Sequence, residues 1–323
     1  MSELTAAGVH DPRSLGISRY VERLAGALGA RGIAYVPATR PQSGAQTHLH
    51  LGNSSRRVAW QWPASHGRYL LTVHDVAPRD RRLLPAYRAV VYPLCVRRAA
   101  QIVVHSIHAA DLLARLADLD IARIEVVPHP ATASAVMPRS EARLALGLPA
   151  EGPPLAVLPG VIKSAKLVCE AVAAAEPLVD RGELELLLAG HVADELTGRY
   201  AIAHGARLLA APDDERYAQA IAAADCVLVL RESSVGETNG PLLDAIGAGR
   251  AVVATRTGSI PEVARGSALL VEPSPAGIRR GLELICDPTE RAARERLTSA
   301  RAKELSWHAS ATRHAELLEE MAA

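Results

Sequence analysis

Short apolar runs alternate with amphipathic segments along almost the whole chain. The runs are rich in Val, Leu, Ile and Ala and end in small or polar residues, whereas the segments between them carry apolar residues at helical spacing. Continuously apolar runs are typical of strands buried on both faces of a parallel sheet, so the pattern predicts an α/β fold. The predicted strands cover residues 4–9, 33–36, 48–51, 69–73, 101–104, 123–128, 155–159, 184–189, 206–210, 226–230, 251–255 and 268–271.

The alternation is interrupted at residues 130–138, which are small, include Pro and follow neither pattern. Such a composition is typical of a linker, and 323 residues are enough for two domains with a core each. We therefore expect a first domain at residues 1–132, a second at residues 133–306 and a last helix at residues 307–323.

Residues 226–264 combine a strand, a polar loop, a helix and a second strand. The loop ends at Gly240, Pro241 opens the helix, and Gly247 ends it. The first N–H groups of a helix have no partner within the helix and can bind a phosphate. The unit therefore predicts an anion site at the end of its first strand.

The order of residues in this stretch resembles the donor-binding region of family-four retaining glycosyltransferases, which have the GT-B fold. The shared features are an acid in a glycine-bearing loop, Pro241, an apolar helix with a second acid, and Gly-Ser-x-Pro-Glu-Val at 258–263. The resemblance is strong over residues 154–307 and looser before residue 130. It implies two Rossmann-like domains facing a cleft, with the nucleotide sugar on the second and the last helix returning to the first.

In that family the helical acid binds the ribose hydroxyls and the loop acid faces the sugar. The resemblance places these roles on Asp244, one methylene shorter than the family's usual Glu, and on Glu237. Aligned on Pro241, the family's loop Glu falls on Gly236, so Glu237 departs from the pattern by one position. The alternatives are a solvated acid on the helix face and an ordinary loop charge.

The family's Gly-x-x-x-x-x-Lys motif matches Gly160 and Lys166, which the resemblance places at the donor diphosphate. Its usual Arg is Val161 here, and Lys163 is the candidate substitute. A lysine in a partly dry cleft stabilises a diphosphate leaving group, whereas a solvated surface lysine has no such effect. Further donor contacts are expected at Gly190 and His191, for the base, and at Thr238, Asn239 and Gly240, for the diphosphate.

Two positions in the first domain complete the implied site. Gly16 precedes an amphipathic helix and would approach the donor; the alternative is a mere tight turn. His74 ends a strand in the pair His-Asp, where an imidazole can hydrogen bond a sugar hydroxyl or position the acceptor; the alternative is a structural histidine. Asn53 and Ser54 follow another strand, as in an acceptor pocket. His74, Lys166 and Glu237 are the expected catalytic residues.

Residues 79–100 carry six arginines and an apolar face that Pro93 interrupts. A basic amphipathic helix can lie on an anionic membrane surface. Packing inside the domain is the favoured alternative, because Pro93 would kink such a face.

Composition narrows the classes of function. The 36 basic and 35 acidic residues nearly balance, which argues against a dedicated nucleic-acid binder. No apolar run reaches the roughly 18 residues that span a bilayer, and the start of the chain is unlike a signal peptide, so we expect a cytoplasmic protein. The four scattered cysteines predict free thiols. Ser106, after the strand at 101–104, predicts a helix cap, and Asp213 and Asp214 predict another in preference to a metal site.

These observations favour a retaining, metal-independent glycosyltransferase without a cofactor. Its donor would be a UDP-, GDP- or dTDP-linked sugar, and its acceptor a hydroxyl of a small metabolite, a lipid or a glycan. A non-catalytic protein that binds a nucleotide sugar or a partner enzyme is the alternative, motivated by the departures at Val161, Gly236 and Asp244. A nicotinamide-dependent dehydrogenase fits less well, because no Gly-x-Gly-x-x-Gly follows an early strand.

Overall fold

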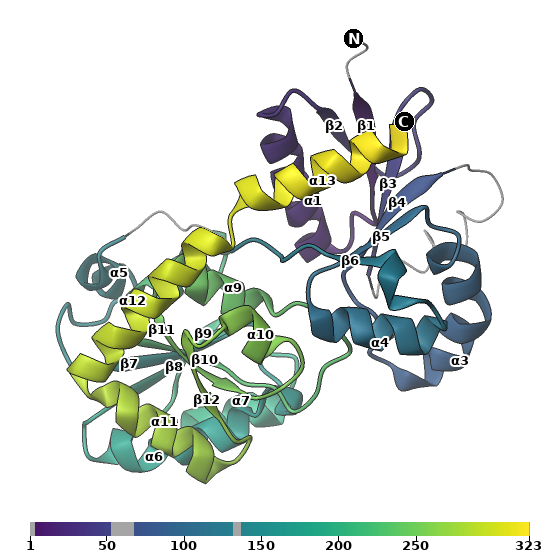
Figure 1. The fold of residues 1–323 in the computed structure, drawn as a ribbon. Coiled ribbons are helices and arrows are strands. Elements are labelled where there is room, and N and C mark those ends of the chain that lie inside the picture. Colours follow the sequence, from purple (N-terminus) through teal and green to yellow (C-terminus); the bar gives the residue numbers. More distant parts are fainter. Residues whose placement is uncertain (1–3, 53–67, 132–136, 323) are drawn as a thin grey trace. The chain divides into compact units, whose positions relative to one another are not determined.

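The computed structural model describes residues 4–52, 68–131 and 137–322. Two compact units make up the structure (Figure 1). The first comprises the chain up to Pro130, Val235–Thr238 and the chain from Leu305, and the second comprises Ala131–Ser234 and Asn239–Glu304. The boundary expected between residues 132 and 133 lies outside the described residues, as do Asn53 and Ser54.

Six parallel strands form the sheet of the first unit, in the order β2-β1-β3-β4-β5-β6. The order reverses between β1 and β3, and ligands of open α/β sheets bind outside the carboxyl ends of strands at such a reversal. The strands are β1 (Thr5–Val9), β2 (Ala34–Ala38), β3 (Gln46–Leu51), β4 (Tyr69–Val73), β5 (Gln101–Val104) and β6 (Ile124–Val126).

Helices pack on both faces of this sheet. One face shares an apolar cluster with α1 (Leu15–Gly29) and with α13 (Trp307–Ala322), which lies beside α1 (Figure 1). The opposite face packs against η2 (Tyr87–Val96) and α4 (Ile107–Ala117). The last helix of the chain is therefore part of the first unit.

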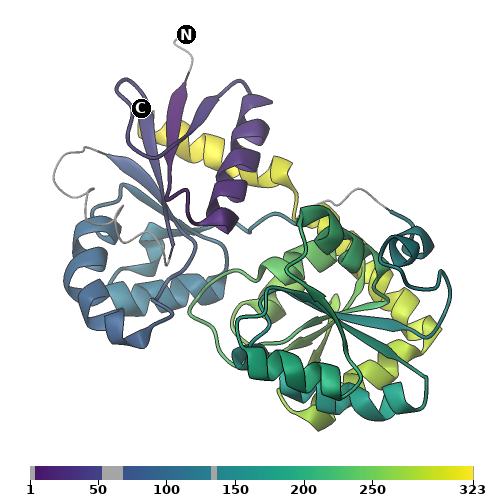
Figure 2. The same cartoon turned by 180° about the vertical axis from the view of Figure 1, so that it is seen from behind.

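The second sheet is also six-stranded and parallel, in the order β12-β11-β10-β7-β8-β9. Its order reverses between β7 and β10, and Figure 2 shows it from behind with helices around it. Its strands are β7 (Leu155–Pro159), β8 (Glu185–Gly190), β9 (Arg207–Ala210), β10 (Cys226–Val229), β11 (Ala251–Thr255) and β12 (Ala268–Val271). Its helices are α5 (Arg139–Ala145), α6 (Val168–Asp180), α7 (Glu195–Ala203), α8 (Asp214–Ala223), α9 (Gly240–Gly247), α10 (Ile260–Ala264), α11 (Pro275–Cys286) and α12 (Pro288–Glu304).

The two sheets confirm the predicted α/β fold. Two expected helix caps are also confirmed: the Ser106 hydroxyl accepts from the N–H of Ala109 at 3.0 Å, and the Asp213 carboxylate accepts from the N–H of Arg216 at 2.8 Å. Among the described residues, no group of three or more potential ligands is placed to hold a metal ion.

The arginine-rich segment packs into the first unit. It folds into short helical turns (η1, Arg81–Leu83, and α3, Leu84–Ala86) followed by the π-helix η2, which contains Pro93. Tyr92 and Cys95 of η2 are buried in the core, so its apolar face is not available to a membrane. Within the described parts of the chain, no helix is both long and apolar enough to cross a bilayer.

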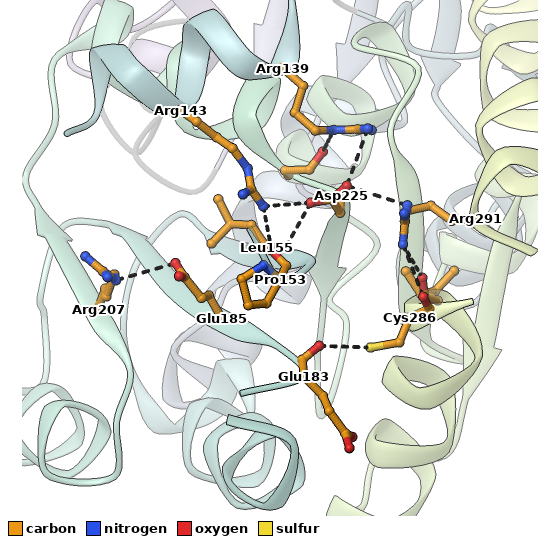
Figure 3. A network of polar contacts seen from close by, with 12 residues as sticks. Arg139, Arg143, Pro153, Leu155, Glu183, Glu185, Arg207, Asp225, Cys286 and Arg291 are labelled. Atoms are coloured by element: carbon orange, nitrogen blue, oxygen red, sulfur yellow. Dashed lines mark hydrogen bonds and ion pairs between the residues drawn. The ribbon is translucent and has the colours of Figure 1, made fainter. Parts of the chain in front are cut away.

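A buried carboxylate ties the amino ends of the strands in the second unit to two helices (Figure 3). Asp225, 6 % exposed, lies 2.9 Å from the guanidinium of Arg143, 3.4 Å from that of Arg139 and 3.5 Å from that of Arg291. It also accepts from the N–H of Leu155 at 2.9 Å. Three arginines thus surround one carboxylate, so its negative charge stabilises a cluster that would otherwise repel itself.

Candidate functional site

Three turns meet at the carboxyl ends of β7, β8 and β10 in the second unit. Gly160 has a φ of 97° and donates its N–H to the carbonyl of Ala189 at 2.9 Å. A Cβ at Gly190 would lie 1.7 Å from the carbonyl oxygen of Gly160, and one at Gly160 would lie 3.4 Å from Cγ of Pro241. Only glycine at position 190 allows this approach, which brings two predicted donor residues next to the start of α9.

Asn239 caps the start of α9. Its Oδ1 accepts from the N–H of Leu242 at 3.2 Å, which identifies the other amide atom as the NH2 group. The side chain is buried, with Asn239 4 % exposed, and Nδ2 has no hydrogen-bond partner within the described chain. A buried donor without a partner is costly, so this amide is a candidate donor to an acceptor atom of a ligand. The next residue, Gly240, is exposed.

Asp244 lies one turn into α9 and is half-buried. Its Oδ2 accepts a hydrogen bond from the hydroxyl of Tyr217 on α8 at 3.2 Å. Tyr217 thereby limits the orientations of the carboxylate. This contact could not be predicted from the sequence, because the two residues are 27 positions apart and on different helices.

The two candidate lysines follow β7. The N–H of Ile162 donates to the carbonyl of His191 at 2.8 Å, which joins the turn after β7 to the turn after β8. Lys166 ends a short 3-10 helix and is 9 % exposed, whereas Lys163 is half-buried and His191 is exposed. Lys166 is therefore not a freely solvated surface lysine, which was the ordinary alternative for it.

The loop at Gly236 and Glu237 groups with the first unit, as does Thr238. Gly236 has a φ of 84°, and a Cβ there would lie 2.7 Å from the side chain of Val76, so only glycine fits. The Glu237 side chain is 8 % exposed, and its Oε2 accepts from the N–H of Val235 at 2.7 Å. The family's Glu could not occupy position 236 in this backbone, which gives a physical reason for the shifted acid.

Gly16 lies inside the first turn of α1, which begins at Leu15. The prediction that the helix begins after Gly16 is therefore wrong, and the alternative of a tight turn at Gly16 does not hold either. No described atom lies within 4 Å of a Cβ built on Gly16, and its φ is not positive, so neither backbone nor packing requires glycine there. Gly16 is exposed, which leaves room for a ligand to approach the backbone.

His74 follows β4 and is surrounded by other histidines. Its Nε2 is 3.1 Å from Nδ1 of His50, and its Nδ1 is 3.2 Å from Nε2 of His105. The ring of Tyr20 packs edge-on against it, with centroids 4.9 Å apart. Both ring nitrogens are engaged, so a direct hydrogen bond from His74 to a sugar hydroxyl would have to replace one of these contacts.

Burial also controls the charge of this histidine cluster. Desolvation, followed by repulsion from the neighbouring imidazoles, lowers the pKa of His74 well below its ordinary value. The same desolvation lowers the pKa of His129 and of His314 to about 4. The cluster is therefore uncharged at neutral pH.

Sequence reasoning missed most of this cluster. His48 and His50 alternate along β3 and therefore point to the same face, a signal that was present in the pattern. It also missed Asp11, which follows β1, is 5 % exposed and accepts from Arg13 Nε at 3.0 Å. In the second unit the structure brings together Gly160, Gly190, the backbone of His191 and the start of α9, and in the first unit it holds Gly16, His74, Glu237 and Thr238.

Residues 154–286, which belong to the second unit except for Val235–Thr238, match the family model described as glycosyl transferases group 1. Comparison with the curated proteins finds no match.

Solved structures resemble the whole chain. A sucrose-phosphate synthase from Thermosynechococcus elongatus is 18% identical, with a TM-score of 0.78 over 98% of this chain and 99% of that one. HepE from Anabaena, solved with UDP and glucose, is 12% identical, with a TM-score of 0.76 over 98% and 100%. A glycosyltransferase from Rickettsia africae is 13% identical, with a TM-score of 0.69 over 99% of each chain. Residues 154–286 thus match the glycosyl transferases group 1 model, in a chain that has the GT-B fold.

Proposed function

We propose that the protein transfers a sugar from a nucleoside-diphosphate donor to a hydroxyl acceptor, with retention at the anomeric carbon. The observation that carries this proposal is the unpartnered, buried amide of Asn239 at the start of α9, next to the glycine turns after β7 and β8. A diphosphate supplies acceptor oxygens in the charge state that a helix start favours.

The residues of the second unit divide the donor between them. Asn239 Nδ2, the N–H of Gly240 and the ammonium of Lys166 bind the diphosphate, and Lys163 adds charge at its edge. Asp244, oriented by Tyr217, accepts from the ribose hydroxyls. Gly190 and His191 border the base. Because HepE was solved with UDP and glucose, a UDP-sugar is the first donor to test.

The chemistry requires that charge on the leaving diphosphate be stabilised as the sugar acquires oxocarbenium character. Lys166 and the helix-start N–H groups supply that stabilisation. The acceptor attacks from the face that the diphosphate leaves, and the diphosphate takes up its proton, so neither a protein nucleophile nor a metal is needed. In the first unit, Glu237 and His74 orient the sugar, and Gly16 leaves room for the diphosphate of the donor to approach.

The first test measures donor binding and transfer directly. Thermal-shift and calorimetric titrations with UDP, GDP and dTDP identify the base, because a ligand of the folded state raises Tm. Acceptor-dependent release of the nucleoside diphosphate from the matching sugar then establishes transfer. Failure of every nucleoside diphosphate to bind would refute the proposal.

Replacing Asn239 by Ser isolates the amide that carries the proposal. A serine hydroxyl caps the helix as well as Asn does but lacks the buried NH2 donor. We expect the Kd for the nucleoside diphosphate to be about 10- to 100-fold higher than in the wild type, because the loss of one hydrogen bond to a charged acceptor costs that much affinity. The Tm should be unchanged in the absence of ligand. Ser106→Asn on α4, a matched exchange at another cap, serves as the control, and unchanged donor affinity in Asn239→Ser would contradict the assignment.

Replacing Lys166 by Ala tests the stabilisation of the leaving group. We expect kcat to fall about 100-fold with a smaller change in donor Kd, because the charge on the diphosphate grows during the reaction. Lys303→Ala, on exposed α12, is the matched control. A Lys166→Ala enzyme with the kcat of the control would show that this lysine has no part in transfer.

A non-catalytic role is the second candidate. It is favoured by Gly236, where the structure leaves no room for the family's acid, and by exposed Val161 at the position of the family's Arg. Tight binding of a nucleotide sugar without release of diphosphate, whichever acceptor is supplied, would support it.

A further inference from the structure

A continuous chain of hydrogen-bonded side chains crosses the interior of the first unit and includes His74. Six bonds connect its members: Thr72 Oγ1 to His48 Nε2 (2.7 Å), His48 Nδ1 to the Tyr35 hydroxyl (2.8 Å), that hydroxyl to His50 Nε2 (2.8 Å), His50 Nδ1 to His74 Nε2 (3.1 Å), His74 Nδ1 to His105 Nε2 (3.2 Å) and His105 Nδ1 to the Val127 carbonyl (2.9 Å). The strands β2, β3 and β4 and the segments after β5 and β6 supply these groups.

The carbonyl of Val127 fixes the direction of the chain, because a carbonyl oxygen can only accept. His105 must therefore carry its proton on Nδ1, and as a neutral imidazole it accepts at Nε2. The donor to that nitrogen is Nδ1 of His74, so His74 is protonated on Nδ1 and accepts at Nε2.

The same reasoning continues to the other end. His50 donates from Nδ1 to His74 and accepts at Nε2 from the hydroxyl of Tyr35. Tyr35 in turn accepts from Nδ1 of His48, whose Nε2 accepts from the hydroxyl of Thr72. For neutral imidazoles, a single arrangement of protons satisfies all six bonds, with all four histidines in the Nδ1–H form.

Burial keeps these imidazoles neutral. Thr72, His48 and His50 are 0 % exposed, His105 is 4 % exposed, and desolvation lowers the pKa of each of these histidines well below its ordinary value. His74 is half-buried, so it is the member of this chain that a ligand can approach.

We infer that Thr72, His48, Tyr35, His50 and His105 are positioning residues that hold His74 in one tautomer and one ring orientation at the carboxyl end of β4. The ring of His50 stacks on that of His74 with an interplanar angle of 28°, and Tyr20 packs edge-on at 77°, so the neighbours also prevent rotation. A ligand at His74 therefore meets a neutral ring of fixed polarity, with both nitrogens already engaged.

The backbone leaves room for these hydrogen-bonded side chains. A Cβ at Gly8 would lie 2.5 Å from Cε1 of Tyr35, so glycine in β1 makes room for the hydroxyl that joins the two halves. His48 and His50 on β3, and Thr72 and His74 at β4, are each two residues apart and point to the same face of the sheet.

Tyr35→Phe tests the inference, with Tyr69→Phe as the matched control. Tyr69 also donates a buried hydroxyl bond, to the Cys95 carbonyl, but at the opposite end of β4 from His74. Long-range 1H–15N spectra distinguish the two neutral tautomers of each histidine. We expect wild type and Tyr69→Phe to show His48, His50, His74 and His105 as Nδ1–H, the form less common in water. Tyr35→Phe should show mixed tautomers at His48, which loses its link to the Val127 carbonyl, whereas His50, His74 and His105 keep the single form.

His105→Phe removes the link to the Val127 carbonyl and keeps the test valid if Tyr35→Phe does not fold. Without the nitrogens of His105, either direction of the remaining hydrogen bonds satisfies them, so His48, His50 and His74 should show mixed tautomers. Any of the four histidines protonated on Nε2 in the wild type, or His105→Phe with the wild-type pattern at His74, would overturn the inference.

The consequence for rate rests on the proposed function. Once His74 is free to change tautomer, we expect kcat/KM for sugar transfer to fall about tenfold in His105→Phe and not in Tyr69→Phe. Mixed tautomers with an unchanged kcat/KM would overturn the positioning role. A wild type that shows the single tautomers but transfers no sugar would instead overturn the proposed function.

Discussion

Replacing Asp225 by Asn should lower the free energy of unfolding of the second unit by about 3–5 kcal/mol. Asparagine keeps the shape and can still accept from the N–H of Leu155 at 2.9 Å, but it removes the negative charge between Arg139, Arg143 and Arg291. Arg143 is 4 % exposed, so its charge cannot recover its hydration without a rearrangement.

The surroundings add to this effect. Burial, followed by repulsion from Arg139, lowers the pKa of Arg250, a fourth arginine near this cluster. Glu295 pairs with Arg139 and is the other acid that offsets it. The cost of losing Asp225 is therefore the cost of three neighbouring guanidinium groups that repel one another, of which that of Arg143 is buried.

Hydrogen exchange of the β10 amides under increasing denaturant measures this loss, because β10 directly follows Asp225. Glu183→Gln, which removes an exposed carboxylate paired with Arg181 at 2.8 Å, is the control and should leave the exchange unchanged. Equal exchange in Asp225→Asn and Glu183→Gln would show that the buried charge contributes nothing to stability.

Acidification should destabilise the first unit steeply between pH 6.5 and pH 4. The pKa values of six histidines are lowered in the folded chain, to about 4 for two of them and well below the ordinary value for the others: His48, His50, His74, His105, His129 and His314. Below about pH 6.5 the unfolded chain binds protons that the folded chain excludes, so stability falls with pH until the folded groups also titrate.

The size of the effect follows from linkage. Each histidine that stays neutral contributes a slope of about 1.4 kcal/mol per pH unit, so His314 alone costs about 3 kcal/mol by pH 4. The sum over the cluster approaches the whole stability of an ordinary domain, about 5–15 kcal/mol. Tyr20 and Tyr35, whose raised pKa values keep their hydroxyls neutral, provide no compensating negative charge.

Tryptophan fluorescence during urea unfolding can follow this unit, because Trp307 belongs to it and no tryptophan occurs in residues 131–234 or 239–304. His314→Gln should flatten the dependence of stability on pH by about 1.4 kcal/mol per pH unit, whatever it does to stability at pH 7. His191→Gln, in the second unit, is the control. A slope in the wild type no steeper than in His314→Gln would contradict the prediction.

Much of the fold could be predicted because parallel sheets leave a strong local signal. The apolar runs at 69–73, 101–104, 155–159, 251–255 and 268–271 are strands with those bounds in the structure. The caps at Ser106 and Asp213 were equally readable, since a cap is a contact between residues three positions apart. The start of α1 was placed too late because the apolar spacing begins at Ile17, whereas the helix includes the two residues before it.

The candidate site was likewise predictable only in part. Its donor residues were predicted from order along the chain, since the loop, Pro241 and Asp244 are neighbours in the sequence. Their local constraints were not: the closeness of Gly190 to Gly160, the bond from Tyr217 to Asp244 and the steric limit at Gly236 all depend on residues far apart in the chain.

The sequence by itself determined the alternation of strands and helices, the presence of a group 1 glycosyltransferase pattern in its second half and the residues offered to a donor. The tertiary structure alone decided which nitrogen of His74 is protonated, which donor of Asn239 lacks a partner and which acid lies among three arginines. The physical reason is range: propensity, periodicity and capping act over a few residues, whereas burial and buried hydrogen bonds depend on groups that only folding brings together.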